Sequence, residues 1–210
     1  MKEWLFASTV TMFARFVTGV RGNWIGCLPD PRPRVYFGNH RSHGDFVLIW
    51  TVLPRMVRRM TRPVAGADYW LKGALRRFIG EQVFRAVLID RIARTREVDP
   101  ISLMLAALDE GSSLIFFPEG TRNTSEAPLL PFRAGLFHIA RSRPDVELVP
   151  VWIDNLNRVM PKGEVIPVPL LCTVTFGTPI QLEPGEERAD FLTRGRAALL
   201  SLAPVKESES

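Results

Sequence analysis

Short apolar runs alternate along the chain with longer segments in which apolar and polar positions recur at helical spacing. The runs of strand length lie at 34–38, 63–67, 85–90, 113–117, 148–153 and 172–178. The segments of helix length lie at 45–59, 69–80, 99–110, 133–143 and 187–202. This alternation predicts an α/β fold with a mostly parallel central sheet that is flanked by helices.

The first twenty residues have the pattern of a helix with a wide apolar surface. Polar residues recur at spacings of 3, 4 and 3, which predicts a single polar stripe: Ser8, Thr11, Arg15 and Thr18. The longest uncharged run, Trp4–Ala14, is well short of the roughly 20 residues that cross a bilayer. No small-residue cleavage site follows, so we expect no signal peptide. The helix either packs on the domain or lies in a membrane interface, with Trp4 and Trp24 as anchors.

Prolines suggest where the folded domain begins. The segment 28–33 contains three prolines, and we expect it to be a stiff connector. It would join an N-terminal amphipathic, membrane-associating region at 1–27 to a folded domain at 34–202. The polar segment 203–210 is expected to be a disordered tail. A length of 210 residues is sufficient for one domain with one substantial core.

Charge is distributed unevenly along the chain. Residues 55–96 contain eleven Lys/Arg and three Asp/Glu, net +8, whereas residues 97–210 contain ten and sixteen, net −6. The basic segment suits anionic lipid headgroups, phosphorylated substrates or an acidic carrier protein, although part of it is an ordinary solvated face. No familiar nucleic-acid-binding motif accompanies it, so we expect no nucleic-acid partner. Cys27 and Cys172 have no paired spacing, which argues against a disulfide framework and favours a reducing compartment.

A polar turn, residues 38–45, follows the first strand of the predicted sheet. This is the edge at which open α/β sheets bind ligands. His40 and Asp45 are five residues apart, a spacing that would not align them on one face of a regular helix. A turn between them can instead fold the carboxylate onto the imidazole. Such a contact fixes the tautomer and leaves the other ring nitrogen free to take a proton. Alternatively, Asp45 caps the next helix, or His40, His43 and Asp45 are metal ligands.

Three further polar clusters lie in or after predicted strands: Asp90–Arg91, Glu119–Asn123 and Pro150. Gly120 would let the backbone approach a ligand closely, and the guanidinium of Arg122 matches phosphate oxygens. Each cluster also has a structural interpretation, namely a salt bridge, a tight turn and an edge strand. Their shared position at strand ends favours a single site.

In order and spacing, these blocks resemble those of the glycerolipid acyltransferases, the 1-acyl-sn-glycerol-3-phosphate acyltransferases of the PlsC type. The resemblance extends from about Arg34 to Ile153, through Asn39-His40-x4-Asp45, Ile89-Asp90-Arg91, Phe117-Pro118-Glu119-Gly120-Thr121-Arg122 and Val149-Pro150-Val151. Residues 132–135 are similar to the basic, glycine-containing segment that commonly follows the third block. The second block departs from the family pattern, because Phe84-Arg85-Ala86 stands where a glycine is usual.

The resemblance implies a fatty acyl transfer from an acyl thioester, either acyl-CoA or acyl-ACP. The acceptor would be a hydroxyl of lysophosphatidate or a related lysophospholipid. His40 would be the general base, oriented by Asp45. Substrate-binding residues would be Arg91, Glu119, Gly120, Thr121 and Arg122, and Pro150 would line the acyl-donor side. We expect no cofactor beyond the thioester co-substrate, and no metal.

Other functions stay open from sequence. The acceptor could be glycerol 3-phosphate or another lysolipid, and a covalent acyl enzyme could use Ser42 or a cysteine as the nucleophile. A metal-dependent hydrolase and a non-catalytic lipid-binding protein are further alternatives. Because the acceptor and product would be lipids, we expect a monotopic protein on the cytoplasmic face of the inner or cell membrane.

Overall fold

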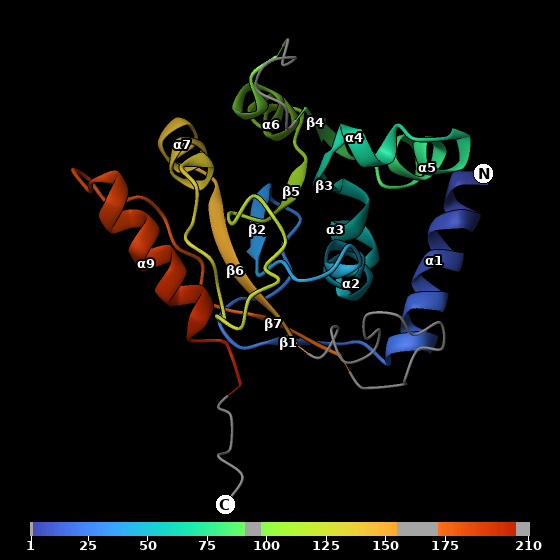
Figure 1. Ribbon diagram of the computed structural model, residues 1–210, viewed down its shortest axis with the longest axis horizontal. Helices are drawn as coiled ribbons and strands as arrows, with labels where there is room; N and C mark the ends of the chain where they lie inside the picture. Colours follow the sequence, from blue (N-terminus) through green and yellow to red (C-terminus); the bar gives the residue numbers. More distant parts are fainter. Residues whose placement is uncertain (1, 91–97, 155–171, 205–210) are drawn as a thin grey trace, which may run out of the picture.

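The computed structural model describes residues 2–90, 98–154 and 172–204, with side chains described from Phe6 onward within those ranges. In these ranges seven strands form one sheet, in the order β1-β7-β6-β2-β5-β3-β4 (Figure 1). The strands are β1 (Arg21–Trp24), β2 (Arg34–Gly38), β3 (Thr61–Gly66), β4 (Val87–Ile89), β5 (Ser113–Phe116), β6 (Glu147–Asp154) and β7 (Thr173–Phe176). The five from β6 to β4 are mutually parallel, and β7 runs antiparallel to β6. The predicted mostly parallel sheet is therefore confirmed.

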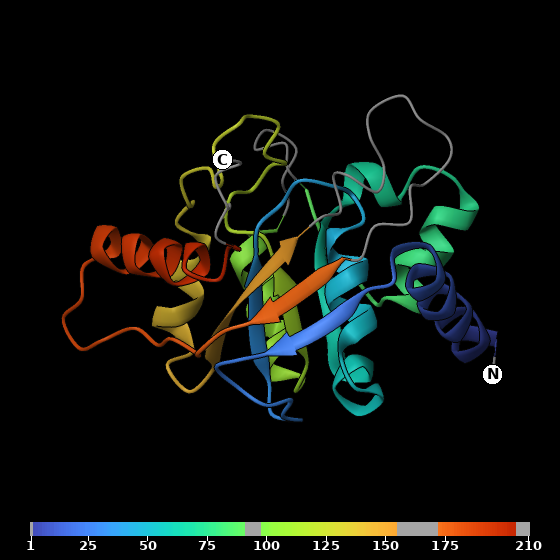
Figure 2. The same ribbon diagram turned by 90° about the horizontal axis from the view of Figure 1, so that it is seen from below.

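Helices cover both faces of the sheet (Figure 2). One face is covered by α1 (Lys2–Thr18), α2 (Asp45–Val52) and α3 (Arg55–Met60), and the other by α6 (Pro100–Asp109), α7 (Gly135–Ser142) and α9 (Arg188–Leu200). The central strand supplies both cores by alternation. Tyr36 joins the core under α2, whereas Val35 and Phe37 join the core under α6, α7 and α9, and all three are fully buried.

Two segments predicted as single helices are interrupted. The segment 45–59 divides into α2 and α3, because Pro54 disfavours helical geometry at Leu53, whose ψ is 137°. The segment 69–80 contains α4 (Ala67–Trp70), α5 (Ala74–Phe78) and the start of a π-helical turn, Ile79–Val83. Gly73, with φ of 90°, separates α4 from α5 in a conformation that glycine adopts without a steric cost.

The sheet begins earlier in the chain than the predicted domain start at residue 34. Residues 21–24, assigned from sequence to the N-terminal segment, form the edge strand β1 and pair in parallel with β7. Only Trp24 of the four is more than marginally covered, so the strand has no alternating apolar pattern to reveal it. Most of the predicted tail, residues 205–210, lies outside the described residues, while Ala203 still packs against the core.

The polar stripe predicted for the N-terminal helix is divided: Ser8 and Arg15 are exposed, whereas the two threonines face the domain. Thr11 and Thr18 are buried, and their hydroxyls donate to the carbonyls of Ala7 and Ala14 at 2.8 and 2.6 Å. The outer side of α1 is apolar, with Met12 69 %, Phe13 66 % and Phe16 87 % exposed. Within the described ranges, the helices are too short or too polar for a bilayer span. The side chain of Trp4 lies outside the described ones, and Trp24 stacks on Phe176.

Candidate active site

The site forms where β2 and β5 end side by side. The central strand pairs with β5 on one side and with β6 on the other, all in parallel. The turn after Gly38 and the turn after Phe116 therefore reach the same edge of the sheet. This is the edge at which the sequence predicted the polar clusters to meet.

The predicted contact between His40 and Asp45 is confirmed. Nδ1 of His40 lies 2.9 Å from Oδ2 of Asp45, and the two side chains are 15 % and 2 % exposed. The same carboxylate oxygen accepts the backbone N–H groups of Arg41 and Ser42 at 2.7 and 2.8 Å. One buried oxygen thus closes the turn and orients the imidazole. The other ring nitrogen, Nε2, has no hydrogen-bond partner among the described residues.

The alternatives for this turn can be compared with its geometry. Asp45 is the first residue of α2 rather than its N-cap, which is Gly44. The ring of His43 stacks on Tyr69, 4.9 Å between centroids, so it does not converge with the other two side chains. In the described ranges no three His, Cys, Asp or Glu side chains gather as a metal site would require. The fully buried thiol of Cys172 is a poor nucleophile, since burial raises its pKa to about 11.

Phe117 supports the imidazole from the side. Its ring stacks on that of His40, with centroids 4.3 Å apart and planes 15° apart. It also lies close to Gly38, where a Cβ would approach the Phe117 ring to 3.4 Å and the Val151 carbonyl to 3.0 Å. Sequence analysis placed Phe117 in the third block but gave it no role. The contact depends on the register of β2 against β5, which a single sequence does not reveal.

Glu119, predicted to bind substrate, is buried in this structure and hydrogen-bonded to the backbone. Its Oε1 accepts from the N–H of His40 and its Oε2 from the N–H of Leu130, both at 2.8 Å, and it is 2 % exposed. Burial raises the pKa of Glu119, while the two backbone donors and the nearby His40 oppose that rise. Glu119 therefore joins the end of β5 to the backbone of the turn that contains His40.

Two asparagines that sequence analysis did not single out fix the same turn. The side-chain amide of Asn39 donates to the carbonyl of Ile153 at 2.9 Å and accepts from its N–H at 2.7 Å. It therefore extends the pairing of β2 with β6 by one step. The backbone N–H of Asn123 donates to the carbonyl of His40 at 2.6 Å. Their positions in the sequence were the available signal: Asn39 directly precedes His40, and Asn123 directly follows Arg122.

The predicted phosphate-binding turn is open to solvent. Gly120, Thr121 and Arg122 are exposed, and Gly120 has φ of 69°. A Cβ on Gly120 would lie 2.6 Å from Cδ of Arg133, so the side chain of Arg133 passes directly over this glycine. Within the described residues neither Arg122 nor Arg133 makes an ion pair. Two guanidinium groups without an ion pair among the described residues thus lie at this turn. The sequence indicated Arg133 only as part of a basic segment.

Two predicted site residues remain, and one of them, Pro150, pairs with Phe37 of β2 beside the His40 turn. Arg91 falls in 91–97, outside the described residues. Pro150 is not on an edge strand, since β6 lies between β7 and β2. Val151 is three positions after Leu148, whereas Ile180 is four positions after Phe176, so one extra residue at 177–179 forms a bulge opposite Pro150. A bulge accommodates a residue without an N–H inside a sheet.

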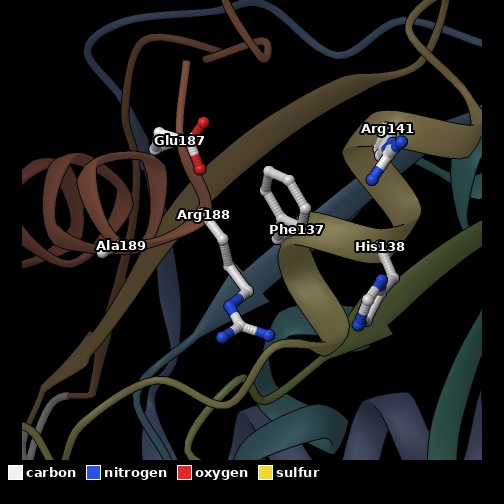
Figure 3. A pocket seen from close by; sticks show the side chains of 6 residues that line it. All are labelled: Phe137, His138, Arg141, Glu187, Arg188 and Ala189. Atoms are coloured by element: carbon white, nitrogen blue, oxygen red, sulfur yellow. The ribbon is translucent and has the colours of Figure 1, made fainter. Parts of the chain in front are cut away.

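A separate hollow of about 370 Å³ lies between α7 and α9 (Figure 3). Its lining combines an aromatic floor with basic and acidic groups: Phe137, His138, Arg141, Glu187, Arg188 and Ala189. None of the predicted site residues lines it. It is therefore distinct from the His40 turn.

A family model described as Acyltransferase matches residues 27–154, which include the His40 turn and the Glu119 turn. The chain belongs to the acyltransferase family. The resemblance seen in the sequence blocks is thereby confirmed at the level of the family.

Individual relatives agree with this membership. The chain is 34 % identical over 145 residues to the 1-acyl-sn-glycerol-3-phosphate acyltransferase of Haemophilus influenzae, covering 63 % of this chain and 54 % of the relative. It is 30 % identical over 138 residues to the Escherichia coli protein of the same name, covering 60 % and 51 %. The chain thus spans about half the length of these curated relatives.

A solved structure has the same fold. The 1-acyl-sn-glycerophosphate acyltransferase PlsC from Thermotoga maritima matches with a TM-score of 0.74 at 18 % identity, covering 99 % of this chain and 83 % of that one. At this identity the match establishes the architecture of the sheet and its helices.

Proposed function

We propose that this acyltransferase transfers a fatty acyl group from an acyl thioester to the free hydroxyl of 1-acyl-sn-glycerol 3-phosphate or a related lysophospholipid. The observation that carries the proposal is the 2.9 Å contact between Nδ1 of His40 and buried Oδ2 of Asp45. Relatives named 1-acyl-sn-glycerol-3-phosphate acyltransferase support the acceptor class. Glycerol 3-phosphate is the second candidate acceptor, since it presents the same phosphate to the same turn.

The chemistry needs a base but no covalent intermediate. Asp45 accepts a hydrogen bond from the Nδ1–H group of His40. Nε2 is therefore left unprotonated and can take the proton of the acceptor hydroxyl. The hydroxyl oxygen forms an ester bond with the thioester carbon, and the carbon–sulfur bond breaks. The leaving thiolate then takes the proton from the imidazolium, which restores neutral His40. General-base catalysis of this kind contributes about 10²–10⁴-fold.

Arg122 and Arg133 would hold the acceptor phosphate. Both are exposed, lie at the turn that follows β5, and have no ion-pair partner among the described residues. A guanidinium group offers paired donors that match phosphate oxygens. Holding the phosphate there would orient the hydroxyl towards His40, which converts a two-body encounter into a positioned one. The acyl donor would be acyl-CoA or acyl-ACP, with Pro150 on the donor side.

The protein would work as a monotopic enzyme on the cytoplasmic face of the inner or cell membrane. The outer side of α1 exposes Met12, Phe13 and Phe16, an apolar surface suited to a membrane interface. Basic residues of the segment 55–96 would add attraction to anionic headgroups. An acyl carrier protein is the other acidic partner that this segment could receive.

The dyad is tested by three substitutions, assayed with lysophosphatidate and acyl-CoA. We expect His40→Ala and Asp45→Asn each to lower kcat by about 10²–10⁴-fold, because the base or its orienting carboxylate is lost. His43→Ala serves as the control, since its ring stacks on Tyr69, and should retain most activity. Circular dichroism and Tm verify folding. Equal losses at His43 and His40, with sensitivity to chelators, would refute the dyad.

The phosphate contact is tested by comparing phosphorylated and neutral acceptors. Arg122→Ala should lower kcat/KM for lysophosphatidate by about 10–100-fold, which corresponds to one charge-assisted hydrogen bond. Monoacylglycerol, which lacks the phosphate, should be used as poorly by the variant as by the original protein. Arg141→Ala, on the far part of α7, is the charge-matched control. An unchanged preference for the phosphorylated acceptor would refute the assignment of Arg122.

A further inference from the structure

Arg58 occupies an unusual position beneath α1. Its Nη1 donates to Oγ1 of Thr11 at 2.6 Å, and its Cζ lies 5.3 Å from the ring centroid of Trp50. Its Nε is buried and has no hydrogen-bond partner in the described ranges. A partly buried guanidinium group is thus held between α1 and α2 by neutral groups, with one donor unsatisfied. Leaving a buried donor without a partner is costly.

The charged groups that act on Arg58 are other arginines, which do not balance its positive charge. Arg15 is one turn beyond Thr11 on α1, and Arg55 is nearly one turn before Arg58 on α3. Burial lowers the pKa of Arg58, and repulsion from Arg15 and Arg55 lowers it further. Among the described residues, neither Arg15 nor Arg58 forms an ion pair with a carboxylate. Within the described ranges, Arg15 and Arg58 therefore carry positive charge that no carboxylate of the chain pairs with.

The surroundings of the cluster are apolar and exposed. Met12 and Phe16 follow Thr11 and Arg15 on α1, and are 69 % and 87 % exposed. Met56, next to Arg55 on α3, is 74 % exposed. An anion that reaches these arginines would meet hydrocarbon-compatible side chains beside them. A phospholipid combines both features in one molecule, a phosphate and fatty chains.

We propose that Arg15 and Arg58 bind the phosphate of an anionic phospholipid at the junction of α1 and α3, while its fatty chains lie against Met12 and Phe16. The inference rests on the proposed membrane location of α1. The site is not the acceptor site. Arg58 precedes the amino end of β3, whereas His40 follows the carboxyl end of β2, and both strands are parallel to β5 between them. The bound lipid would hold α1 onto the domain at the membrane.

Vesicle sedimentation tests the lipid site. Full-length protein is titrated with phosphatidylcholine vesicles that contain or lack phosphatidylglycerol. Arg59→Met is the matched control, because Arg59 is exposed on the same helix α3 and its removal costs only general attraction, about fivefold. Arg15→Met and Arg58→Lys should each weaken binding to phosphatidylglycerol vesicles by about tenfold or more. Arg15 is exposed, so its substitution keeps the fold. Losses no larger than that of Arg59→Met would overturn the site.

Two further arms separate the sources of phosphate and the underlying proposals. Inorganic phosphate alone should raise Tm much less than phosphatidylglycerol vesicles, and an equal rise would replace the lipid by free phosphate and overturn the proposal.

Phe16→Asp should weaken binding to both kinds of vesicle. If it does not, the membrane location of α1 fails. If it does, while Arg15→Met matches Arg59→Met, the lipid site alone fails. Acyl transfer in detergent by Arg15→Met should stay unchanged, because Arg15 is remote from His40.

Discussion

The buried carboxylate of Glu119 is one of the groups that fix the backbone of His40. Its two oxygens each accept one backbone N–H, from His40 and from Leu130. A polar turn rich in carboxylate and glycine suggests substrate binding from sequence, but the same carboxylate can equally satisfy the protein's own amides. Which of these occurs depends on the path of the chain at Leu130, eleven residues away, and local pattern does not fix that path.

Glu119→Gln tests this positioning role. The amide keeps one acceptor but presents N–H₂ to the other backbone donor, so we expect a loss of about 1–3 kcal/mol in the free energy of unfolding. The variant should also lower kcat more than it changes KM for lysophosphatidate, since it displaces His40 rather than a substrate contact. Urea denaturation and steady-state kinetics measure the two effects. A change confined to KM would instead support the prediction that Glu119 contacts the substrate.

The pH dependence of that variant has a defined sign. The folded-state pKa of Glu119 is raised above its ordinary value near 4.5, so the folded protein holds this proton more tightly than the unfolded chain. Its contribution to stability is full below about pH 4.5 and is lost as pH rises through the raised folded value. The stability cost of Glu119→Gln should therefore be largest at the acidic end and decline with rising pH.

Other contacts at the residue scale differ in how far sequence could predict them. The His40–Asp45 contact was predictable, because a five-residue spacing within one turn brings the groups together through local geometry alone. The stacking of Phe117 on His40 and the passage of Arg133 over Gly120 were not. Each needs the neighbouring positions of β2 and β5 or the return of the chain after residue 130.

At the scale of elements, helix α1 shows that part of a polar stripe can face the domain instead of solvent. The buried threonine hydroxyls of Thr11 and Thr18 bind carbonyls of their own helix, so they enter the interface without unsatisfied donors. Small side chains on that face permit close packing, and the large apolar residues are left outside. Periodicity predicted the helix and its two faces. Periodicity could not predict which face packs on the domain, because an apolar face can contact either a protein core or a membrane.

Removing residues 1–24 should destabilise the domain as well as release it from membranes. The deletion removes β1 and the apolar contacts of Val10, Val17 and Val20 with the core beneath α2. We expect the free energy of unfolding to fall by at least about 3 kcal/mol, from 1.5–3 kcal/mol per buried side chain. Phe16→Ala, which removes only exposed surface, is the control and should change it by less than about 0.5 kcal/mol. A truncated protein of unchanged stability in urea would contradict the role of α1 and β1.

At the scale of the whole molecule, basic and apolar surfaces lie on the same side. α1 contacts α3 through Thr11 and Arg58, and contacts α5 through the rings of Phe6 and Phe78, 5.4 Å apart. α3 and α5 contain exposed arginines, while the other face of the sheet is covered by α6, α7 and α9 from the net-acidic part of the chain (Figure 2). Sequence revealed the charge asymmetry. The fold converts it into a direction in which the molecule would approach an anionic surface.

Strand order was the part of the fold least accessible from sequence. Alternation of strands and helices predicted the parallel body of the sheet, and β2, at Arg34–Gly38, was predicted to the residue. The edge formed by β1 and β7 was not predicted as such. Its pairing joins residues 21–24 to residues 173–176, and β1 has neither an apolar alternation nor a turn that points to its partner.

That pairing also sets an order of events during synthesis. β1 leaves the ribosome about 150 residues before β7, and at 5–20 residues per second it waits roughly 8–30 s for the strand that it pairs with among the described residues. During this interval β1 has no strand beside it, while the outer side of α1 already exposes its phenylalanines. A nascent chain of this kind would meet the lipid surface before its sheet is complete, and the last strand would close the fold on a helix already in place.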